Sequence, residues 1–245
     1  VYDEHIGYIR IASFQERTGD DLKKALREIE AKARPLKGIV LDMRNNPGGL
    51  LNQSVEVSDA FLKTGIIVST RGRSKNMESK AVAKDDGDEP TCPMVVLVNE
   101  GTASAAEIVS GALQDNGRAV ILGAQTFGKG SVQTVIPLED GAALKLTTAK
   151  YYTPKGRSIQ AEGITPDIMV KQIRPPEEKA EEKANAENHM LREKDLKGHI
   201  KSPTEDEVKV DNAKKETDIL DKDTQLKNAI DILKSWDILK KNMKG

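Results

Sequence analysis

A run of apolar residues followed at once by a helical pattern is the feature that most constrains how this chain can fold. Met94 to Val98 is a short, largely β-branched run of the kind that forms a strand buried on both faces. The stretch from Gly101 to Leu113 then repeats apolar residues at helical spacing. A strand that passes directly into a helix is the repeating unit of a parallel sheet covered by helices.

The same alternation extends over the first half of the chain. Further strands are predicted at 6–14, 38–42, 66–70 and 119–123, with helices at 18–35 and 51–62. Thr18 begins a sequence of capping-box form, and the polar stretch 71–89 indicates a surface loop. Beyond Ser131, the strands 132–138 and 143–153 are joined through Asp140-Gly141, a hairpin signal, and a short strand follows at 168–170. These patterns predict an α/β fold with flanking helices and a C-terminal β extension.

A change of composition after Arg174 indicates a boundary. Residues 1–174 are predicted to form the core, and residues 175–245 a charged helical tail rich in Lys, Glu, Asp and Asn. Leu226, Ile230 and Leu233 restore an apolar stripe near the end of this tail. A terminal helix with such a stripe is expected to dock on another surface, and a second copy of the chain is a candidate for it.

Bulk properties exclude several classes of function. A net charge of −1 gives no reason to expect nucleic acid as a partner, and no apolar run approaches the ~20 residues of a transmembrane helix. The sequence begins without Met or a basic and apolar leader, so any export signal is expected to have been removed already. Cys92 reads as a packing residue, and the three histidines show no metal-ligand spacing. We therefore expect neither a metal nor another cofactor.

Ser104 stands where the strand that begins at Met94 becomes a helix. A hydroxyl there lies near the unpaired backbone N–H groups and the positive end of the helix dipole, which favour negative charge on or beside the oxygen. This is a suitable position for a nucleophile. A simpler interpretation is that Ser104 only caps the helix.

Lys129, between Gly128 and Gly130, is a candidate base. Glycines allow close approach of the backbone, and desolvation can lower the pKa of a buried lysine by up to about 3–5 units, which leaves a neutral amine that can take a proton from serine. Gln133, four residues further along a predicted strand, is expected on the same face and could orient the amine. The alternative is that Lys129 is a solvated turn residue.

The same stretch comes close to a phosphate-binding loop, which would make the protein a nucleotidase. That motif requires Ser or Thr directly after the lysine and opens a helix, whereas Gly130 and a β-branched strand follow here. The nucleotidase alternative predicts magnesium-dependent nucleotide binding.

Consecutive glycines, Gly48 and Gly49, follow the strand that ends in Asp42. Their backbone N–H groups could point into a cleft, as an oxyanion hole requires. The N–H of Ala105, directly after Ser104, could be the other donor. A tight turn with a local Asn hydrogen bond is the alternative.

Four segments in this order, LDMRNNPGG, NEGTASAAEI, TFGKGSVQT and TPKGRSIQAEGITPD, resemble the carboxy-terminal processing peptidases, also called tail-specific proteases. The resemblance covers Gly7 to Val170. It implies a crotonase-like core and a serine endopeptidase with a Ser/Lys dyad. Ser104 matches the family's nucleophile, Lys129 its base and Gln133 the residue that positions the base, while Gly48 and Ala105 match its oxyanion-hole positions.

The resemblance also implies partners and a location. Family members cleave proteins near unstructured C-termini, in the bacterial periplasm, at the cell envelope or in the chloroplast lumen. Homo-oligomers and adaptor proteins are further expectations. Nothing in this sequence corresponds to the PDZ domain that typically grips the substrate tail as an added strand. The competing hypothesis is a catalytically silent scaffold that binds peptides in the same cleft.

Overall fold

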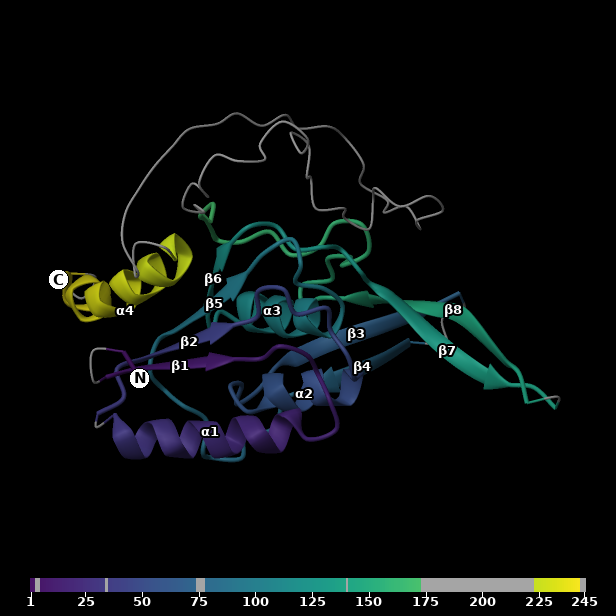
Figure 1. Cartoon of the computed structure of the whole chain (residues 1–245), viewed down its shortest axis with the longest axis horizontal. Helices are drawn as coiled ribbons and strands as arrows, with labels where there is room; N and C mark the ends of the chain where they lie inside the picture. Colours follow the sequence, from purple (N-terminus) through teal and green to yellow (C-terminus); the bar gives the residue numbers. More distant parts are fainter. Residues whose placement is uncertain (3–4, 34, 74–77, 140, 173–222, 243–245) are drawn as a thin grey trace, which may run out of the picture.

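The fold combines two sheets with helices (Figure 1). The structure is a computed structural model that describes residues 1–2, 5–33, 35–73, 78–139, 141–172 and 223–242. Most of the predicted charged tail, residues 175–222 and 243–245, lies outside these residues. That the topology of the core is crotonase-like remains a prediction.

A five-stranded parallel sheet forms the centre, with the strand order β1-β2-β5-β6-β9. Its strands are β1 (Ile6–Arg10), β2 (Gly38–Asp42), β5 (Met94–Val98), β6 (Val120–Gly123) and β9 (Ile168–Met169). β2 and β5 are buried along their whole length, as their continuous apolar sequences predict. The expectation that the strand beginning at Met94 is buried on both faces is confirmed.

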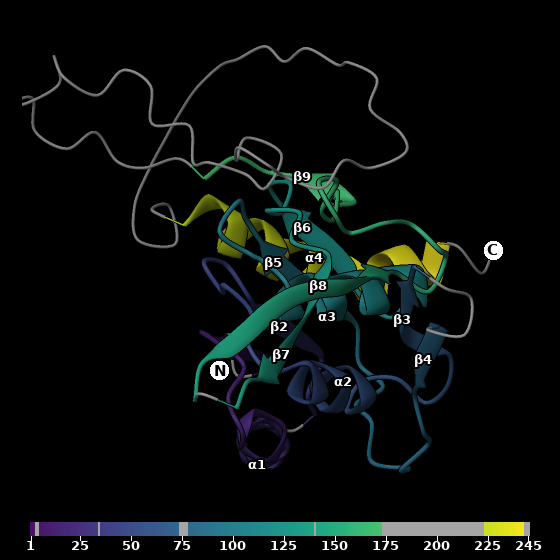
Figure 2. The same cartoon turned by 90° about the vertical axis from the view of Figure 1, so that its right-hand side faces the viewer.

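Helices cover both faces of this sheet (Figures 1 and 2). α1 (Thr18–Lys32), α2 (Leu51–Asp59) and α3 (Ala105–Asp115) share one hydrophobic cluster with Ile39, Leu41 and Val96. α4 (Thr224–Asn242) shares another with Val40 and Val95, which alternate with them along the strands. The apolar stripe of the terminal helix therefore packs on the sheet of its own chain. The boundary at residue 174 and the oligomerising role stay predictions.

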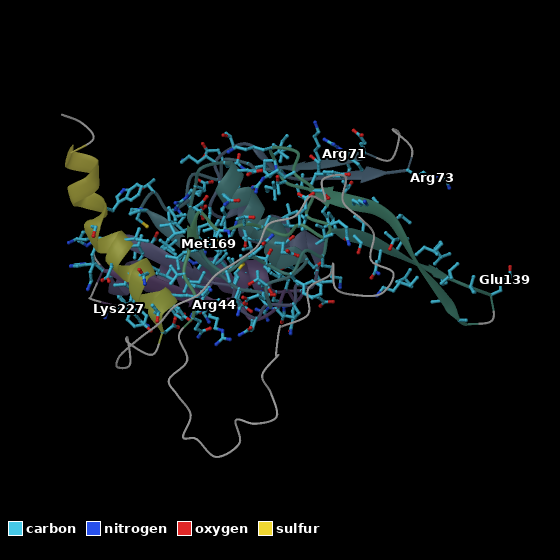
Figure 3. All side chains as sticks on the ribbon, turned by 90° about the horizontal axis from the view of Figure 1, so that it is seen from above. Arg44, Arg71, Arg73, Glu139, Met169 and Lys227 are labelled. Carbon is cyan, nitrogen blue, oxygen red and sulfur yellow. The ribbon has the colours of Figure 1, made fainter. Side chains whose placement is uncertain are left out.

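A second, antiparallel sheet has the order β4-β3-β8-β7. Its strands are β3 (Ile66–Gly72), β4 (Glu78–Val82), β7 (Ser131–Pro137) and β8 (Ala143–Tyr152). β7 and β8 continue beyond β3 as a two-stranded ribbon that projects from the body, with Glu139 near its tip (Figures 1 and 3). The predicted hairpin is confirmed.

Three local expectations were wrong. Thr18 does not cap α1: the N-cap residue is Arg17, and the Thr18 hydroxyl instead accepts a hydrogen bond from Gln15 N–H. The polar stretch 71–89 contains β4, which pairs with β3. The first strand ends at Arg10 instead of reaching residue 14.

Within the described ranges, no helix combines the length and hydrophobicity needed to cross a membrane. The same residues contain no group of three His, Cys, Asp or Glu side chains that could hold a metal ion.

Candidate active site

Three loops lie close together because each one follows the carboxyl end of one of three neighbouring parallel strands. β2 leads into residues 44–49, β5 into 99–104 and β6 into 124–130, which we call the Gly48, Ser104 and Lys129 loops. β2 pairs with β5, and β5 with β6, all in parallel. The carboxyl ends of parallel strands lie at one edge of a sheet, the usual ligand-binding edge of such folds. The sheet therefore gathers motifs that lie far apart in the sequence.

Ser104 adopts a strained backbone conformation at the start of α3. Its φ is +54° and its ψ is −115°, which lies outside the regions that L-residues usually occupy. The residue is half-buried. Such a conformation costs about 1–3 kcal/mol and persists only where the surrounding structure stabilises it. Strained residues of this kind cluster at functional sites.

Glu107, one turn into α3, joins the Ser104 and Lys129 loops. Its Oε2 atom accepts the backbone N–H groups of both Ser104 and Lys129, each at 2.8 Å. The two nitrogens therefore lie no more than twice that distance apart. Oε1 accepts the Thr126 hydroxyl at 2.5 Å and the Gly128 N–H at 2.7 Å. One side chain thus fixes the backbones of both candidate catalytic residues.

Burial makes this carboxyl unusual. Glu107 is fully buried, and desolvation raises its pKa to about 7, although the four hydrogen bonds act in the opposite direction. Glu107 was not among the site residues predicted from the sequence. The available signal was an ionisable side chain three residues after Ser104, among the apolar residues Ala105 to Val109 in the first turns of the helix.

The Lys129 loop is held by the segment 159–164, part of the fourth motif. Gly130 N–H donates to Gln160 Oε1 at 3.0 Å, and Ala161 N–H donates to the Gly128 carbonyl at 2.8 Å. Lys129 itself is half-buried. No hydrogen bond in the described residues joins its amine to the Ser104 hydroxyl. The structure thus brings the two backbones together, without a hydrogen bond between the two reactive atoms.

Gln133 lies apart from this contact. It is exposed on β7, which begins only at Ser131, so Lys129 precedes the strand. A bulge between Val132 and Gln133 also interrupts the alternation of side chains. The argument that Lys129 and Gln133 share a strand face is therefore wrong. No hydrogen bond of the described chain connects them, and a positioning role for Gln133 stays a prediction.

Gly48 packs directly against Ser104 and Ala105. A Cβ atom built on Gly48 would lie 2.8 Å from Ser104 Cβ and 3.0 Å from Ala105 N. With φ at +99°, this position suits only glycine. The predicted oxyanion-hole residues are thus neighbours in space.

Their N–H groups differ in availability. Gly48 N–H already donates to Asn46 Oδ1 at 2.9 Å. Within the described residues, neither Ala105 N–H nor Gly49 N–H has a hydrogen-bond acceptor. Gly48 N–H can therefore bind an oxyanion only if it first gives up its hydrogen bond to Asn46 Oδ1. Otherwise Gly49 N–H would be the second donor.

The root of the Gly48 loop contains a buried ion pair that sequence reasoning also missed. Arg44 Nε and Nη2 donate to Asp42 Oδ1 and Oδ2, at 3.0 and 2.6 Å. The Tyr8 hydroxyl donates to the same Asp42 Oδ2 at 2.7 Å. Burial and this hydrogen bond raise the pKa of Tyr8 to about 12. Opposite charges directly after a buried strand were the sequence signal.

Comparison with known proteins places this chain in a family. The model of peptidase family S41 matches residues 5–170. A carboxy-terminal-processing protease of Bartonella bacilliformis is 54% identical over 204 residues, which cover 82% of this chain and 45% of that protein. A carboxyl-terminal-processing protease of Synechocystis is 43% identical over 170 residues, 69% of this chain and 39% of that protein. The chain thus spans less than half the length of these two relatives.

Solved structures agree. The photosystem II D1 C-terminal processing protease is 38% identical and superposes with a TM-score of 0.63, over 68% of this chain and 42% of that chain. A putative peptidase from Parabacteroides merdae, at 21% identity and a TM-score of 0.59, shares the fold over 71% of this chain and 56% of its own. Since the family model covers most of the sequence and the same motifs meet at one edge of the sheet, the chain belongs to peptidase family S41.

Proposed function

We propose that this chain carries the catalytic core of a serine endopeptidase that cleaves polypeptides near their C-termini. The main support is the convergence of the Gly48, Ser104 and Lys129 loops on the strained Ser104, with Glu107 holding two of them together. The names of its relatives, which are carboxy-terminal processing proteases, support the same activity.

In the proposed reaction, Ser104 Oγ attacks the peptide carbonyl while the neutral Lys129 amine accepts the hydroxyl proton. Ala105 N–H, together with that of Gly48 or Gly49, stabilises the oxyanion. The amine then returns the proton to the departing amino group, which leaves an acyl-enzyme on Ser104. Water, deprotonated by the same amine, attacks this ester, and the second collapse releases the other product and regenerates the serine.

Two contacts must form before this reaction can occur. The Lys129 amine must hydrogen-bond to the Ser104 hydroxyl, and the free Ala105 N–H must face the carbonyl oxygen together with a second donor from Gly48 or Gly49. Catalytic hydrogen bonds are often long or absent without substrate and tighten when it binds. We propose that a bound substrate tail completes both contacts.

The proposed substrates are proteins with unstructured, apolar C-terminal tails in the periplasm or at the cell envelope. An unstructured tail can enter a cleft as an extended chain, whereas a folded segment cannot. We also propose that the protein forms homo-oligomers and binds an adaptor protein.

Replacing Lys129 tests this function. Lys129→Ala should abolish cleavage of casein, a loose substrate, and Ser104→Ala should do the same, while circular dichroism shows a native fold. Lys145→Ala is the matched control, because Lys145 is exposed on β8, away from the three loops. Undiminished proteolysis by Lys129→Ala would refute the dyad.

The two reactive side chains share no hydrogen bond, which leaves one competing proposal, a silent scaffold that binds peptides in the same cleft. It predicts that the unaltered protein binds a tail peptide and never cleaves it. Cleavage that depends on Ser104 would eliminate this alternative.

A further inference from the structure

The start of α4 contacts the loop that carries Gly48. Arg44 lies at the root of this loop, and Figure 3 shows it beside the first turns of α4, near Lys227. Its side chain is only 9% exposed. Arg44 Nη1 and Nη2 donate to Asp223 Oδ1 and Oδ2, both at 2.7 Å, and Nη1 also donates to Gln225 Oε1 at 3.2 Å. With the two bonds to Asp42, all five N–H groups of the guanidinium have acceptors.

The contacts continue from Arg44 to the nucleophile. Two residues after Arg44, the Asn46 carbonyl accepts Ala103 N–H at 2.8 Å, directly before Ser104. Asn46 Oδ1 holds the Gly48 N–H. A change in the position of Arg44 would therefore reach both sides of the proposed oxyanion hole through only two intervening residues.

We propose that Asp223 is a positioning residue for catalysis: it holds Arg44 in place, and Arg44 in turn sets the position of the Gly48 loop against Ser104. Gln225 assists it. The inference rests on the proposed function, and it makes α4 part of the catalytic unit. Asp223 touches no reacting atom, so its effect on the reaction passes through Arg44.

Several features make α4 a firm anchor for this contact. Asp223 Oδ1 also accepts Leu226 N–H at 3.0 Å, which caps the helix, and Gln225 Nε2 donates to the Val170 carbonyl at 2.8 Å. Leu226 and Ile230 are buried on the parallel sheet. Although burial alone would raise it, hydrogen bonds from Arg44 and Leu226 lower the pKa of Asp223, so the carboxylate stays charged at neutral pH.

The substitution Asp223→Asn isolates this contact. Asparagine caps helices as well as aspartate does, so Oδ1 can keep its bond to Leu226 N–H. The substitution replaces Oδ2 by an amide NH2 group, which is a hydrogen-bond donor. This group then faces Arg44 Nη2, which is also a donor, so the hydrogen bond between them is lost. Asp231→Asn is the matched control, because Asp231 is an exposed residue of the same helix that undergoes the same chemical change.

We would measure peptide cleavage by the full-length protein. Asp223→Asn should lower kcat about tenfold or more with KM nearly unchanged, because the misplaced donors act chiefly in the transition state. Gln225→Ala, which removes one acceptor, should give a smaller loss in the same direction. In an Arg44→Lys background, Asp223→Asn should add little, since its effect passes through Arg44. Asp231→Asn should match the unaltered protein.

Hydrogen exchange gives a readout that does not depend on activity. The amides of Gly48 and Ala103 should exchange about tenfold faster in Asp223→Asn than in Asp231→Asn, because the loop opens more often. An unchanged kcat and unchanged exchange would overturn the inference, as would a lower melting temperature with kcat unaffected. If Ser104→Ala still cleaves, the proposed function fails instead, and the exchange rates alone decide whether α4 holds the loop.

Discussion

Gly48 occupies a point where no side-chain atom fits. Replacing it by alanine would place a Cβ 2.8 Å from Ser104 Cβ and 2.9 Å from the Ala103 carbonyl oxygen, at a φ of +99°. We expect Gly48→Ala to lower kcat at least about 100-fold, comparable to the loss of one oxyanion donor. Steady-state cleavage of a peptide by the folded variant is the measurement.

The control for backbone strain alone is Gly87→Ala. Gly87 has a similar φ of +82°, but nothing lies within 4 Å of an added Cβ. This variant should lose some stability and keep its kcat. Equal kcat values for Gly48→Ala and the unaltered protein would mean that Gly48 does not shape the site.

Glu107 predicts a pH dependence of stability. Its pKa is about 7 in the folded protein, above the usual 4.5, so the folded state binds the proton more tightly than the unfolded chain does. Glu107 therefore makes its whole contribution to the free energy of unfolding below pH 4.5. As the pH rises from 4.5 to 7, this contribution is lost, and the free energy of unfolding falls by up to about 3 kcal/mol.

Urea unfolding from pH 4.5 to 7 tests this sign. Glu107→Gln cannot titrate, so the stability of the unaltered protein should fall relative to that of the variant across the window. Glu16→Gln, at an exposed position, should follow the unaltered protein. Parallel curves for Glu107→Gln and the unaltered protein would contradict the raised pKa.

At the scale of elements, α4 should contribute to stability as a core helix does. Leu233 is 5% exposed and packs over Gly38 of β2. Leu233→Ala should lower the free energy of unfolding by about 2–4 kcal/mol, as measured by urea denaturation. Asp231→Ala, on the exposed side of the same helix, should change it by less than about 0.5 kcal/mol. A negligible effect of Leu233→Ala would show that the helix does not pack on this sheet.

Elements with one strong periodic signal were predictable from the sequence, and those defined by their partners were not. β2 and β5 are continuous apolar runs, so both were predicted with nearly their observed bounds. β4 has a polar, exposed sequence and exists because it pairs with β3. The bulge at Gln133 likewise arises from the pairing with β8, so the face on which Gln133 lies could not be predicted from spacing.

Most of what could be predicted about the site follows from the parallel topology of the central sheet. Strands that alternate with helices place the Gly48, Ser104 and Lys129 loops at one edge, and the motifs named the candidate residues in advance. The contacts that fix these loops come from side chains distant in sequence from the loop that each one holds. Glu107 holds Lys129, Gln160 holds Gly130, and Asp223 holds Arg44. Their partners depend on the tertiary fold, which explains why sequence spacing did not reveal them.

The central claim concerns two atoms, the Lys129 Nζ and the Ser104 Oγ. A crystal structure of the full-length protein with a C-terminal tail peptide bound would test it most directly. We predict that the amine then lies within about 2.6–3.2 Å of the hydroxyl, with the peptide carbonyl oxygen facing Ala105 N–H. An amine that faces solvent with the peptide bound, away from the hydroxyl, would contradict the proposed reaction.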